Sequence, residues 1–280
     1  KEKKASAKKS SVKLEPFSID KMKANLLEQL EKGVASTKNT ISQGEQYAYG
    51  KKTKKGFLRG GKTNLGLVKT PDQVGIKTED NRYLARVIWR IGEVRIPEAV
   101  PHLLKVKTST AIIDAYTMAW ALGRCAAKGD NKAIAYLEGI IDDKDQTASA
   151  KMLAKEAKMA LLSPEEKKKY ANEIYEALPK SFQHPVRNDN ADSLLHIINR
   201  KLNSKKLVYD EIANLYLLSS GLPSVRTTLV KWIKAASMSG GGYFKSIRQL
   251  FKAAEFRDDI PMYGLLAYRI TAADKSFAKN

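Results

Sequence analysis

The sequence predicts an all-α fold: an α–α superhelix (solenoid) of antiparallel helix pairs, preceded by a flexible basic N-terminal segment. The first observation is an internal repeat, because Ile88–Gly92 (IWRIG) recurs as Ala119–Gly123 (AWALG), 31 positions further on. A repeat of this length marks a helical unit that cannot bury its apolar face alone and must stack on a neighbour. The second observation is helical periodicity that persists from residue 80 almost to the C-terminus, and the third is that no alternating strand pattern interrupts it.

The N-terminal part combines a basic tail, one helix and a glycine-rich stretch. Residues 1–17 are rich in Lys, Ser and Ala and are expected to form a disordered linker. The next segment, 18–79, begins with Ser18, a residue type that caps helices, so we expect a helix over 19–32 that stops at Gly33. The rest of this segment is a Gly/Lys-rich loop, because glycines interrupt every helical pattern in it.

Residues 80–178 form the predicted repeat region. Pro97 suits the first turn of a helix, and Ser163 followed three residues later by Glu166 is typical of a capping box. The helices are expected over about 80–91 and 97–106, 110–122 and 131–141, and 146–162 and 164–178.

A second helical segment, 186–280, is predicted after a break at 179–185, which contains two prolines. The run Ser239–Gly242 indicates a flexible joint between two of its helices. The helices of this segment are expected over about 191–202, 206–219, 223–237, 243–256 and 260–271.

The repeat units resemble HEAT-type helical repeats. More narrowly, Arg86–Ala99 and Trp120–Cys125 resemble the helical-repeat part of bacterial WGR-domain proteins, a group that includes molybdate-regulator-like proteins. Leu250–Asp259 with Tyr263–Arg269 resembles another recurring stretch of that group. The resemblance implies a WGR module that would precede Lys1, with the Lys-rich tail as its linker. Nucleic-acid contacts in the group are associated with that module, so the resemblance assigns them to no residue of this chain.

Charge and cysteine content narrow the class of protein. The 280 residues include 50 Lys and Arg against 30 Asp and Glu, a net charge of +20. Residues 1–70 hold 17 of these basic and 6 of these acidic residues. Such an excess favours a polyanion or an acidic partner.

The single cysteine, Cys125, cannot form a disulfide within the chain, and no apolar run is long enough to span a membrane, so we expect a cytoplasmic protein.

Three groups of basic residues are candidate contacts to DNA or RNA. One lies in the Gly/Lys-rich loop beside aromatic side chains, a combination that suits backbone contact and base stacking. The other two recur every three or four positions in predicted helices, so each would follow one helical face. The groups are Lys51, Lys52, Lys54, Lys55, Arg59 and Lys62 in the loop, Arg82, Arg86 and Arg90 in one helix, and Lys245, Arg248 and Lys252 in another. A solvated charged surface explains the same residues, and that alternative stays open.

The predicted function is that of a non-catalytic scaffold that binds DNA or RNA through these groups. Gly56–Thr63 also fits the letters of a phosphate-binding P-loop, but no buried strand precedes it, so we interpret it as a chance match. The three histidines are scattered and have no cysteine partners, so no metal site is predicted, and no cofactor is expected.

Two alternatives to the scaffold stay open. A HEAT-like DNA glycosylase for alkylated bases would need an exposed aromatic side chain and a carboxylate, and Asp114 is the candidate acid. A protein–protein adaptor would need no nucleic acid. The tryptophans Trp89, Trp120 and Trp232 are themselves expected to pack in the core. The sequence predicts no oligomeric state.

Overall fold

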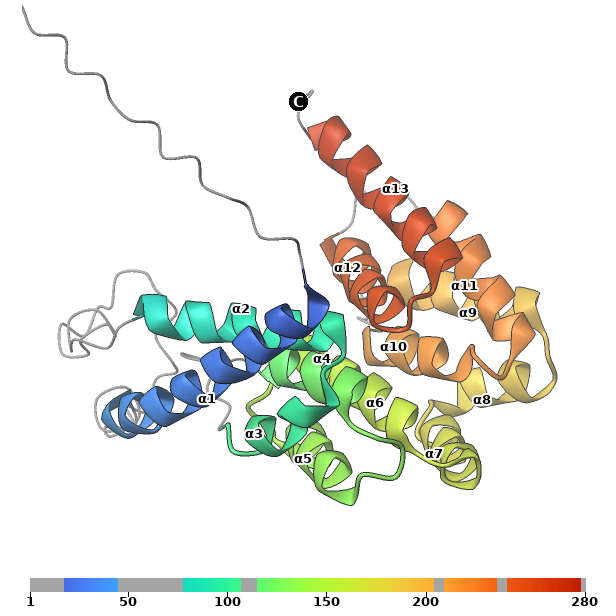
Figure 1. Ribbon diagram of the computed structural model, residues 1–280. Helices are drawn as coiled ribbons and strands as arrows, with labels where there is room; N and C mark the ends of the chain where they lie inside the picture. Colours follow the sequence, from blue (N-terminus) through green and yellow to red (C-terminus); the bar gives the residue numbers. More distant parts are fainter. Residues whose placement is uncertain (1–17, 45–77, 107–114, 204–208, 236–240, 278–280) are drawn as a thin grey trace, which may run out of the picture.

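The computed structural model describes residues 18–44, 78–106, 115–203, 209–235 and 241–277. The regular secondary structure in these ranges is entirely helical, which confirms the all-α prediction (Figure 1). None of the described helices has the length and apolarity needed to cross a bilayer. In chain order they are α1 (Ile19–Gly44), α2 (Thr78–Val94), the 3₁₀ helix η3 (Pro97–Ala99), α3 (Val100–Leu103), α4 (Ala115–Cys125), α5 (Asn131–Asp142), α6 (Ala148–Leu161), α7 (Pro164–Glu176), α8 (Lys180–Arg187), α9 (Ala191–Asn203), α10 (Tyr209–Leu218), α11 (Pro223–Ala235), α12 (Gly241–Phe256) and α13 (Ile260–Phe277).

Side-chain caps start two of the helices where the sequence predicted them. At α1 the backbone amide of Lys21 donates to the Ser18 hydroxyl oxygen at 3.3 Å. At α7 the amide of Glu166 donates to the Ser163 hydroxyl oxygen at 3.3 Å, and the amide of Ser163 donates to the Glu166 carboxylate at 3.0 Å. This reciprocal pair is the predicted capping box, and it satisfies amides that have no partner within the first helical turn.

The prediction that Gly33 ends the first helix is wrong, because α1 continues to Gly44. The glycine lies where α1 meets α2: a Cβ atom at Gly33 would come within 2.5 Å of Leu84 Cδ1. Leu84 is buried in the core. The missing side chain of Gly33 therefore lets two helices approach each other, and it does not serve a left-handed helix end.

The break predicted at 179–185 is also wrong, because α8 covers it. Phe182 and Val186 lie one turn apart on this helix and are both buried. The Gln183 side-chain amide donates to two main-chain carbonyls at the end of α7, at 3.0 and 2.8 Å. The gain from burying an apolar face and from satisfying the end of α7 outweighs the local cost of a proline inside a short helix.

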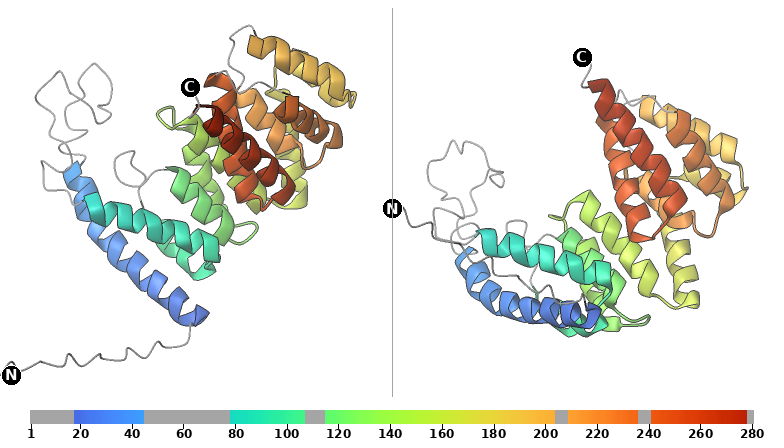
Figure 2. Two further views of the ribbon diagram at one scale, coloured as in Figure 1. Left: turned by 90° about the horizontal axis from the view of Figure 1, so that it is seen from above. Right: turned by 45° about the horizontal axis from the view of Figure 1, so that its top comes forward.

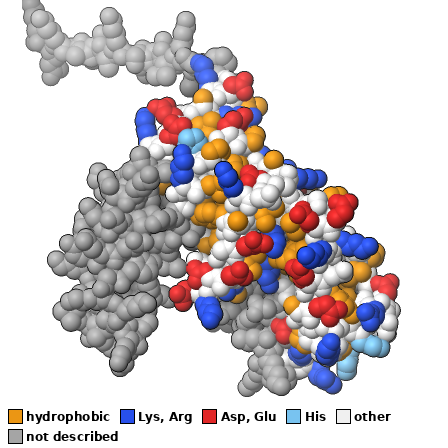
Figure 3. Space-filling view, turned by 90° about the horizontal axis from the view of Figure 1, so that it is seen from below, with side chains coloured by type: hydrophobic (Ala, Val, Ile, Leu, Met, Phe, Trp, Pro, Cys, Tyr) orange, Lys and Arg blue, Asp and Glu red, His pale blue; other side chains and the backbone are white. Residues whose placement is uncertain are grey.

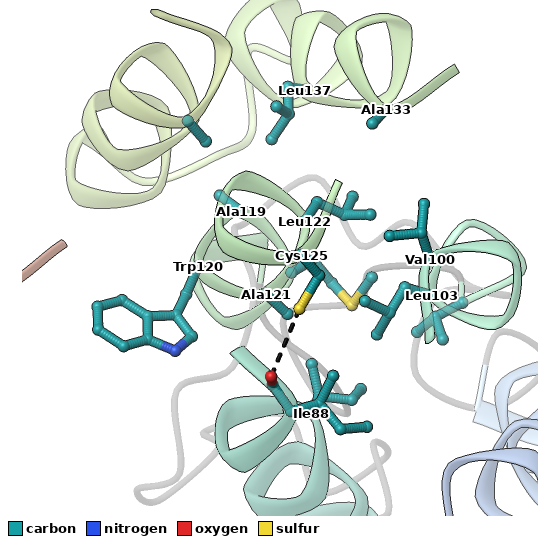
Figure 4. Close-up of a cluster of buried hydrophobic side chains, with 14 of the residues drawn as sticks. Ile88, Val100, Leu103, Ala119, Trp120, Ala121, Leu122, Cys125, Ala133 and Leu137 are labelled. Carbon is teal, nitrogen blue, oxygen red and sulfur yellow. Dashed lines mark hydrogen bonds between the residues drawn. The ribbon is translucent and has the colours of Figure 1, made fainter. Parts of the chain in front are cut away.

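Helices α2, α4 and α6 pack in chain order through the glycines of the repeat. A Cβ atom at Gly92 of α2 would come within 2.6 Å of the Trp120 ring on α4. A Cβ atom at Gly123 of α4 would come within 2.5 Å of the Ala157 Cβ on α6. Gly92 and Gly123, at equivalent positions of the two repeats, thus let the following helix pack closely against α2 and α4. On the other side of α4 from Trp120, aliphatic side chains of α2, α3, α4 and α5 fill the core (Figure 4).

The buried side chains form two clusters, one in each half of the molecule. The first belongs to α1–α6 and includes Phe256, the last residue of α12. The second belongs to α7–α13 and includes Met152 from α6. Helix α12 packs on both α6 and α10, so the C-terminal half lies against the first half instead of extending away from it (Figures 1 and 2).

Candidate nucleic-acid interface

Several predicted contact residues cannot be placed. The loop candidates Lys51, Lys52, Lys54, Lys55, Arg59 and Lys62 and the alternative acid Asp114 lie outside the described residues. Arg82 belongs to α2, and Lys245 and Arg248 belong to α12, but the structure describes only their place along the helices.

The described members of the two helical groups come together around α4. The Lys252 ammonium on α12 lies 4.1 Å from the centre of the Tyr116 ring on α4. Trp89 on α2 stacks on the same tyrosine, with ring centres 5.9 Å apart. Arg86 and Arg90 flank Trp89 along α2 and are exposed. The two predicted basic helices therefore adjoin, and an aromatic side chain separates them.

An aromatic stack forms the middle of this region. Trp89 and Trp120 lie face to face, with ring centres 4.2 Å apart and planes within 3° of parallel. The Trp120 indole nitrogen donates to the main-chain carbonyl of Trp89 at 3.2 Å, and Phe256 meets the Trp120 ring edge-on at 6.1 Å. Trp120 is 2% exposed, so the predicted packing role of this tryptophan is confirmed. Trp232, at 0%, is buried in the second cluster, as expected.

Acidic residues neutralise part of the positive charge beside the stack. The Arg90 guanidinium forms an ion pair with Glu93 at 2.7 Å, and Glu93 also accepts a hydrogen bond from the Trp89 indole at 3.1 Å. Glu255 on α12 faces the same area: burial, together with the negative charge of Glu93, raises its pKa. The basic stripe predicted on α2 and α12 is therefore mixed in charge, and of its described members only Arg86 stays outside these contacts.

Arg124, on α4, forms hydrogen bonds that link α4 to α2 and to the end of α12. Its guanidinium donates to the main-chain carbonyls of Gly92 and Phe256, both at 3.0 Å, and lies 4.6 Å from the centre of the Trp120 ring. It also meets Asp258 at 3.3 Å, and Asp258 forms a second ion pair with Arg95. Arg95 and Asp258 both have left-handed backbones, with φ of 58° and 54°. The chain thus turns sharply after α2 and after α12, and the two turning residues bind each other.

A buried polar network that the sequence did not predict joins the helices of the C-terminal half to α6. Glu156 on α6 is 2% exposed and accepts two hydrogen bonds from the Arg257 guanidinium, at 2.5 and 2.9 Å. Burial raises the pKa of Glu156, and the charge and hydrogen bonds of Arg257 oppose that rise. Arg257 also donates to the main-chain carbonyl of Tyr216 on α10 at 3.1 Å and lies 4.3 Å from the centre of the Tyr216 ring.

Tyr216 extends this network to α11 and α13. Its hydroxyl donates to Asp259 at 3.0 Å, and Arg226 on α11 holds the same carboxylate with two contacts of 2.7 Å. Burial acts to raise the pKa of Asp259, but the hydrogen bonds from Arg226 and Tyr216 outweigh it and leave the pKa lowered. Asp259 also accepts from the amide of Met262 at 3.3 Å in the first turn of α13. Each member thus has a defined partner, as buried charges require.

Cys125 is a packing residue. Its thiol is buried and donates to the Ile91 carbonyl at 3.4 Å, the dashed contact in Figure 4. Burial raises its pKa to about 11, so the thiolate that nucleophilic chemistry needs is scarce near neutral pH. Within the described ranges, no three His, Cys, Asp or Glu side chains gather as a metal site would require.

Comparisons with protein-family models, with curated proteins and with solved structures found no match for this chain. The resemblance to WGR-domain proteins, and the HEAT-like character of the repeats, therefore stay predictions from sequence.

Proposed function

We propose that this chain is a non-catalytic helical-repeat scaffold that binds a polyanion, DNA or RNA. The observation that carries the proposal is the uneven distribution of charge along the chain. Residues 1–70 hold 17 basic and 6 acidic residues, whereas 115–178, which contain α4–α7, hold 10 of each. Excess positive charge that is not balanced by neighbouring acids is the electrostatic footprint of phosphate-backbone binding. The loop group from Lys51 to Lys62 is its densest part.

The scaffold is proposed to be a HEAT-like solenoid over α2–α6. Two features support this architecture. Gly92 and Gly123, one in each repeat, both lie where the following helix packs closest, and Trp89 and Trp120, also one in each repeat, stack on each other. Stacked helical repeats place equivalent residues side by side in this way. Helix α12 then covers the end of the stack through its contacts with α4 and α6.

The proposal is tested by the salt dependence of binding. The full chain is titrated into a labelled DNA duplex, and separately into a labelled single-stranded RNA, while fluorescence anisotropy is recorded from about 50 to about 200 mM salt. We expect log K to fall linearly with log salt concentration, because each phosphate contact releases counterions. No binding at the lowest salt, or binding that salt leaves unchanged, would overturn the proposal.

A matched set of variants locates the contacts. Lys51, Lys52, Lys54 and Lys55 are replaced together by Gln, and the control replaces four exposed lysines of the balanced region, Lys128, Lys132, Lys168 and Lys169, by Gln. Both variants lose the same charge. If all four loop lysines contact phosphates, the first variant should lower the slope magnitude by about 3–4, at roughly 0.9 per contact on duplex DNA, while the control keeps it. Equal loss in both variants would show that only the net charge matters.

The two alternatives predict different readouts. A base-excision glycosylase would release alkylated bases, but Trp120 is buried and stacked, so it cannot hold a flipped base. That alternative would rest on Trp89 and Asp114, and release of a methylated base that is lost on Asp114→Asn would support it over the scaffold. A protein–protein adaptor would keep its partners after nuclease treatment and would fail the anisotropy test.

A further inference from the structure

Beyond the N-terminal excess, the largest surplus of positive charge lies in residues 179–235, which include Lys205 and Lys206 outside the described residues. Residues 115–178 are balanced, with 10 basic and 10 acidic residues, whereas 179–235 hold 9 basic and only 4 acidic residues. This second stretch contains α8–α11, which no candidate group from the sequence included. In Figure 3, Lys, Arg and His side chains gather at the lower right end of the molecule.

The packing of α9 on α11 places basic side chains from both helices on one surface. The Lys231 ammonium on α11 binds the Asp192 carboxylate on α9 at 2.9 Å, and the Thr228 hydroxyl donates to the carbonyl of Ala191 at 3.1 Å. These contacts fix the exposed side of α11 beside the exposed side of α9. Lys234 follows Lys231 by one turn and is also exposed.

On α9, Asp192, His196 and Arg200 recur every four residues and are all exposed, so they form one strip along the helix. We call His196, Arg200, Lys231 and Lys234 the α9–α11 basic surface.

The acids near this surface are already engaged. Asp192 is bound to Lys231, and Glu211 of α10 lies 3.8 Å from Lys201. Among the described residues, no carboxylate comes within 4.0 Å of Arg200 or Lys234. The guanidinium of Arg200 and the ammonium of Lys234 are therefore available to an external anion, unlike Arg90, which Glu93 holds, and Lys252, which lies on Tyr116.

We propose that the α9–α11 basic surface is where the folded body contacts the phosphate backbone of DNA. This inference rests on the proposed polyanion-binding function and assigns it a site on the helices, separate from the loop lysines. Exposed cations on two neighbouring helices can each contact a backbone phosphate, because both side chains are long and donate hydrogen bonds to phosphate oxygens. The four residues that define this surface include no Phe, Tyr or Trp on which bases could stack, so we expect the contact to be independent of sequence.

The test compares charge reversals of equal size in the full chain. The variant R200E/K234E is measured against K128E/K132E, whose lysines are exposed in the balanced region, by anisotropy with a labelled DNA duplex over a salt series. We expect R200E/K234E to weaken binding at least tenfold at low salt and to lower the slope magnitude by about 2, for two lost phosphate contacts, while the control changes binding less than threefold. R200Q/K234Q, which introduces no negative charge, should lower the slope similarly with a smaller loss of affinity.

Each outcome separates this inference from the proposed function. If the unaltered chain binds with salt dependence but R200E/K234E matches the control, the α9–α11 surface is overturned and the scaffold proposal stands. If the unaltered chain does not bind at all, both are overturned. Circular-dichroism melting of each variant shows whether the helices remain folded. If R200E/K234E unfolds, R200Q/K234Q becomes the test. A salt-dependence slope equal to that of the unaltered chain would then overturn the proposal of the α9–α11 basic surface.

Discussion

The two halves of this protein hold their helices together by different chemistry. In the first half, α2, α4 and α6 approach closely at Gly92 and Gly123, and apolar and aromatic contacts predominate over the few hydrogen bonds from α4 side chains to α2 carbonyls. In the second half, a buried polar network runs from Glu156 on α6 through Arg257 and on to α11 and α13. Close packing tolerates little added volume, whereas a buried charge tolerates no lost partner. The first half should therefore fail when a side chain is enlarged, and the second when a charged group is removed.

The largest effect is expected from Arg257→Met. This change leaves the Glu156 carboxylate buried without its partner, and loss of one member of a buried pair costs ~3–5 kcal/mol of unfolding free energy. The measurement is urea unfolding followed by circular dichroism. The double variant E156M/R257M should recover much of the loss, because no charge is then buried. It should not recover all of it, because the hydrogen bonds that Arg257 donates to the carbonyls of Tyr216 and Leu217 on α10 are lost as well.

Arg200→Met is the matched control for that experiment. Arg200 is exposed on α9, so its replacement should change the unfolding free energy by no more than ~0.5 kcal/mol. If Arg257→Met lowers the unfolding free energy no more than this control does, the proposed difference between the halves is wrong, because the polar network would then contribute little to the stability of the second half.

A smaller loss is expected from Gly123→Ala. The added methyl would meet the Ala157 Cβ at 2.5 Å, the Phe256 ring at 2.7 Å and the backbone of Ala157 at 2.9 Å, so a main chain must shift. Overpacking of this kind costs ~1–3 kcal/mol. Gly92→Ala should cost a similar amount, because the nearest atoms there belong to the Trp120 ring, which Trp89 and Phe256 hold in place.

Gly139→Ala is the control for the glycine variants, since it makes the same substitution within α5. A Cβ atom at Gly139 meets nothing within 4 Å, so alanine should stabilise by ~0.4–1 kcal/mol through the lower entropy of the unfolded chain. The measurement is the melting temperature of the three alanine variants. If Gly123→Ala raises the melting temperature as Gly139→Ala does, the close approach of helices at the glycines does not stabilise the first half.

The helices could be predicted from sequence because their signals are local. Ser163 and Glu166 lie three residues apart and specify a helix start wherever the segment packs. The repeat predicted that its helices pack on a neighbour, and α2 and α4, which carry the two tryptophans, do pack on each other. The prediction that Gly33 ends a helix is wrong for a physical reason. A glycine that ends a helix and a glycine that lets a neighbouring helix approach cannot be distinguished in the sequence until the neighbouring residue, here Leu84, is known.

The polar network could not be predicted because its members lie far apart along the chain. Glu156 occurs among lysines of α6, a pattern typical of an exposed helix face, and Arg257 is 101 residues away. Only the return of α12 to α6 brings them together. The basic residues raise a different difficulty. Their spacing predicts which of them share a helical face, but it does not reveal Glu93, which binds Arg90, or Tyr116, which contacts Lys252.

The smallest expected effect is the pH dependence of stability, which tests whether Glu156 is buried as a charged group in the second half's polar network. Burial raises the pKa of Glu156 even beside Arg257, and removing Arg257 removes the group that opposes this rise. The folded Arg257→Met variant therefore binds a proton at Glu156 more tightly than its unfolded chain, so protonation favours the folded state and stability is regained as pH falls. The gap in unfolding free energy between R257M and E156M/R257M should therefore narrow as pH falls from 7 to 5. The narrowing is complete only below the ordinary pKa of glutamate, where it amounts to ~1.4 kcal/mol for each unit by which the pKa of Glu156 is higher in the folded variant than in the unfolded chain. Urea midpoints at several pH values measure the gap. A gap that stays constant would mean that Glu156 keeps its charge without Arg257, and that the carboxylate is not buried as the packing of α6 against α12 requires.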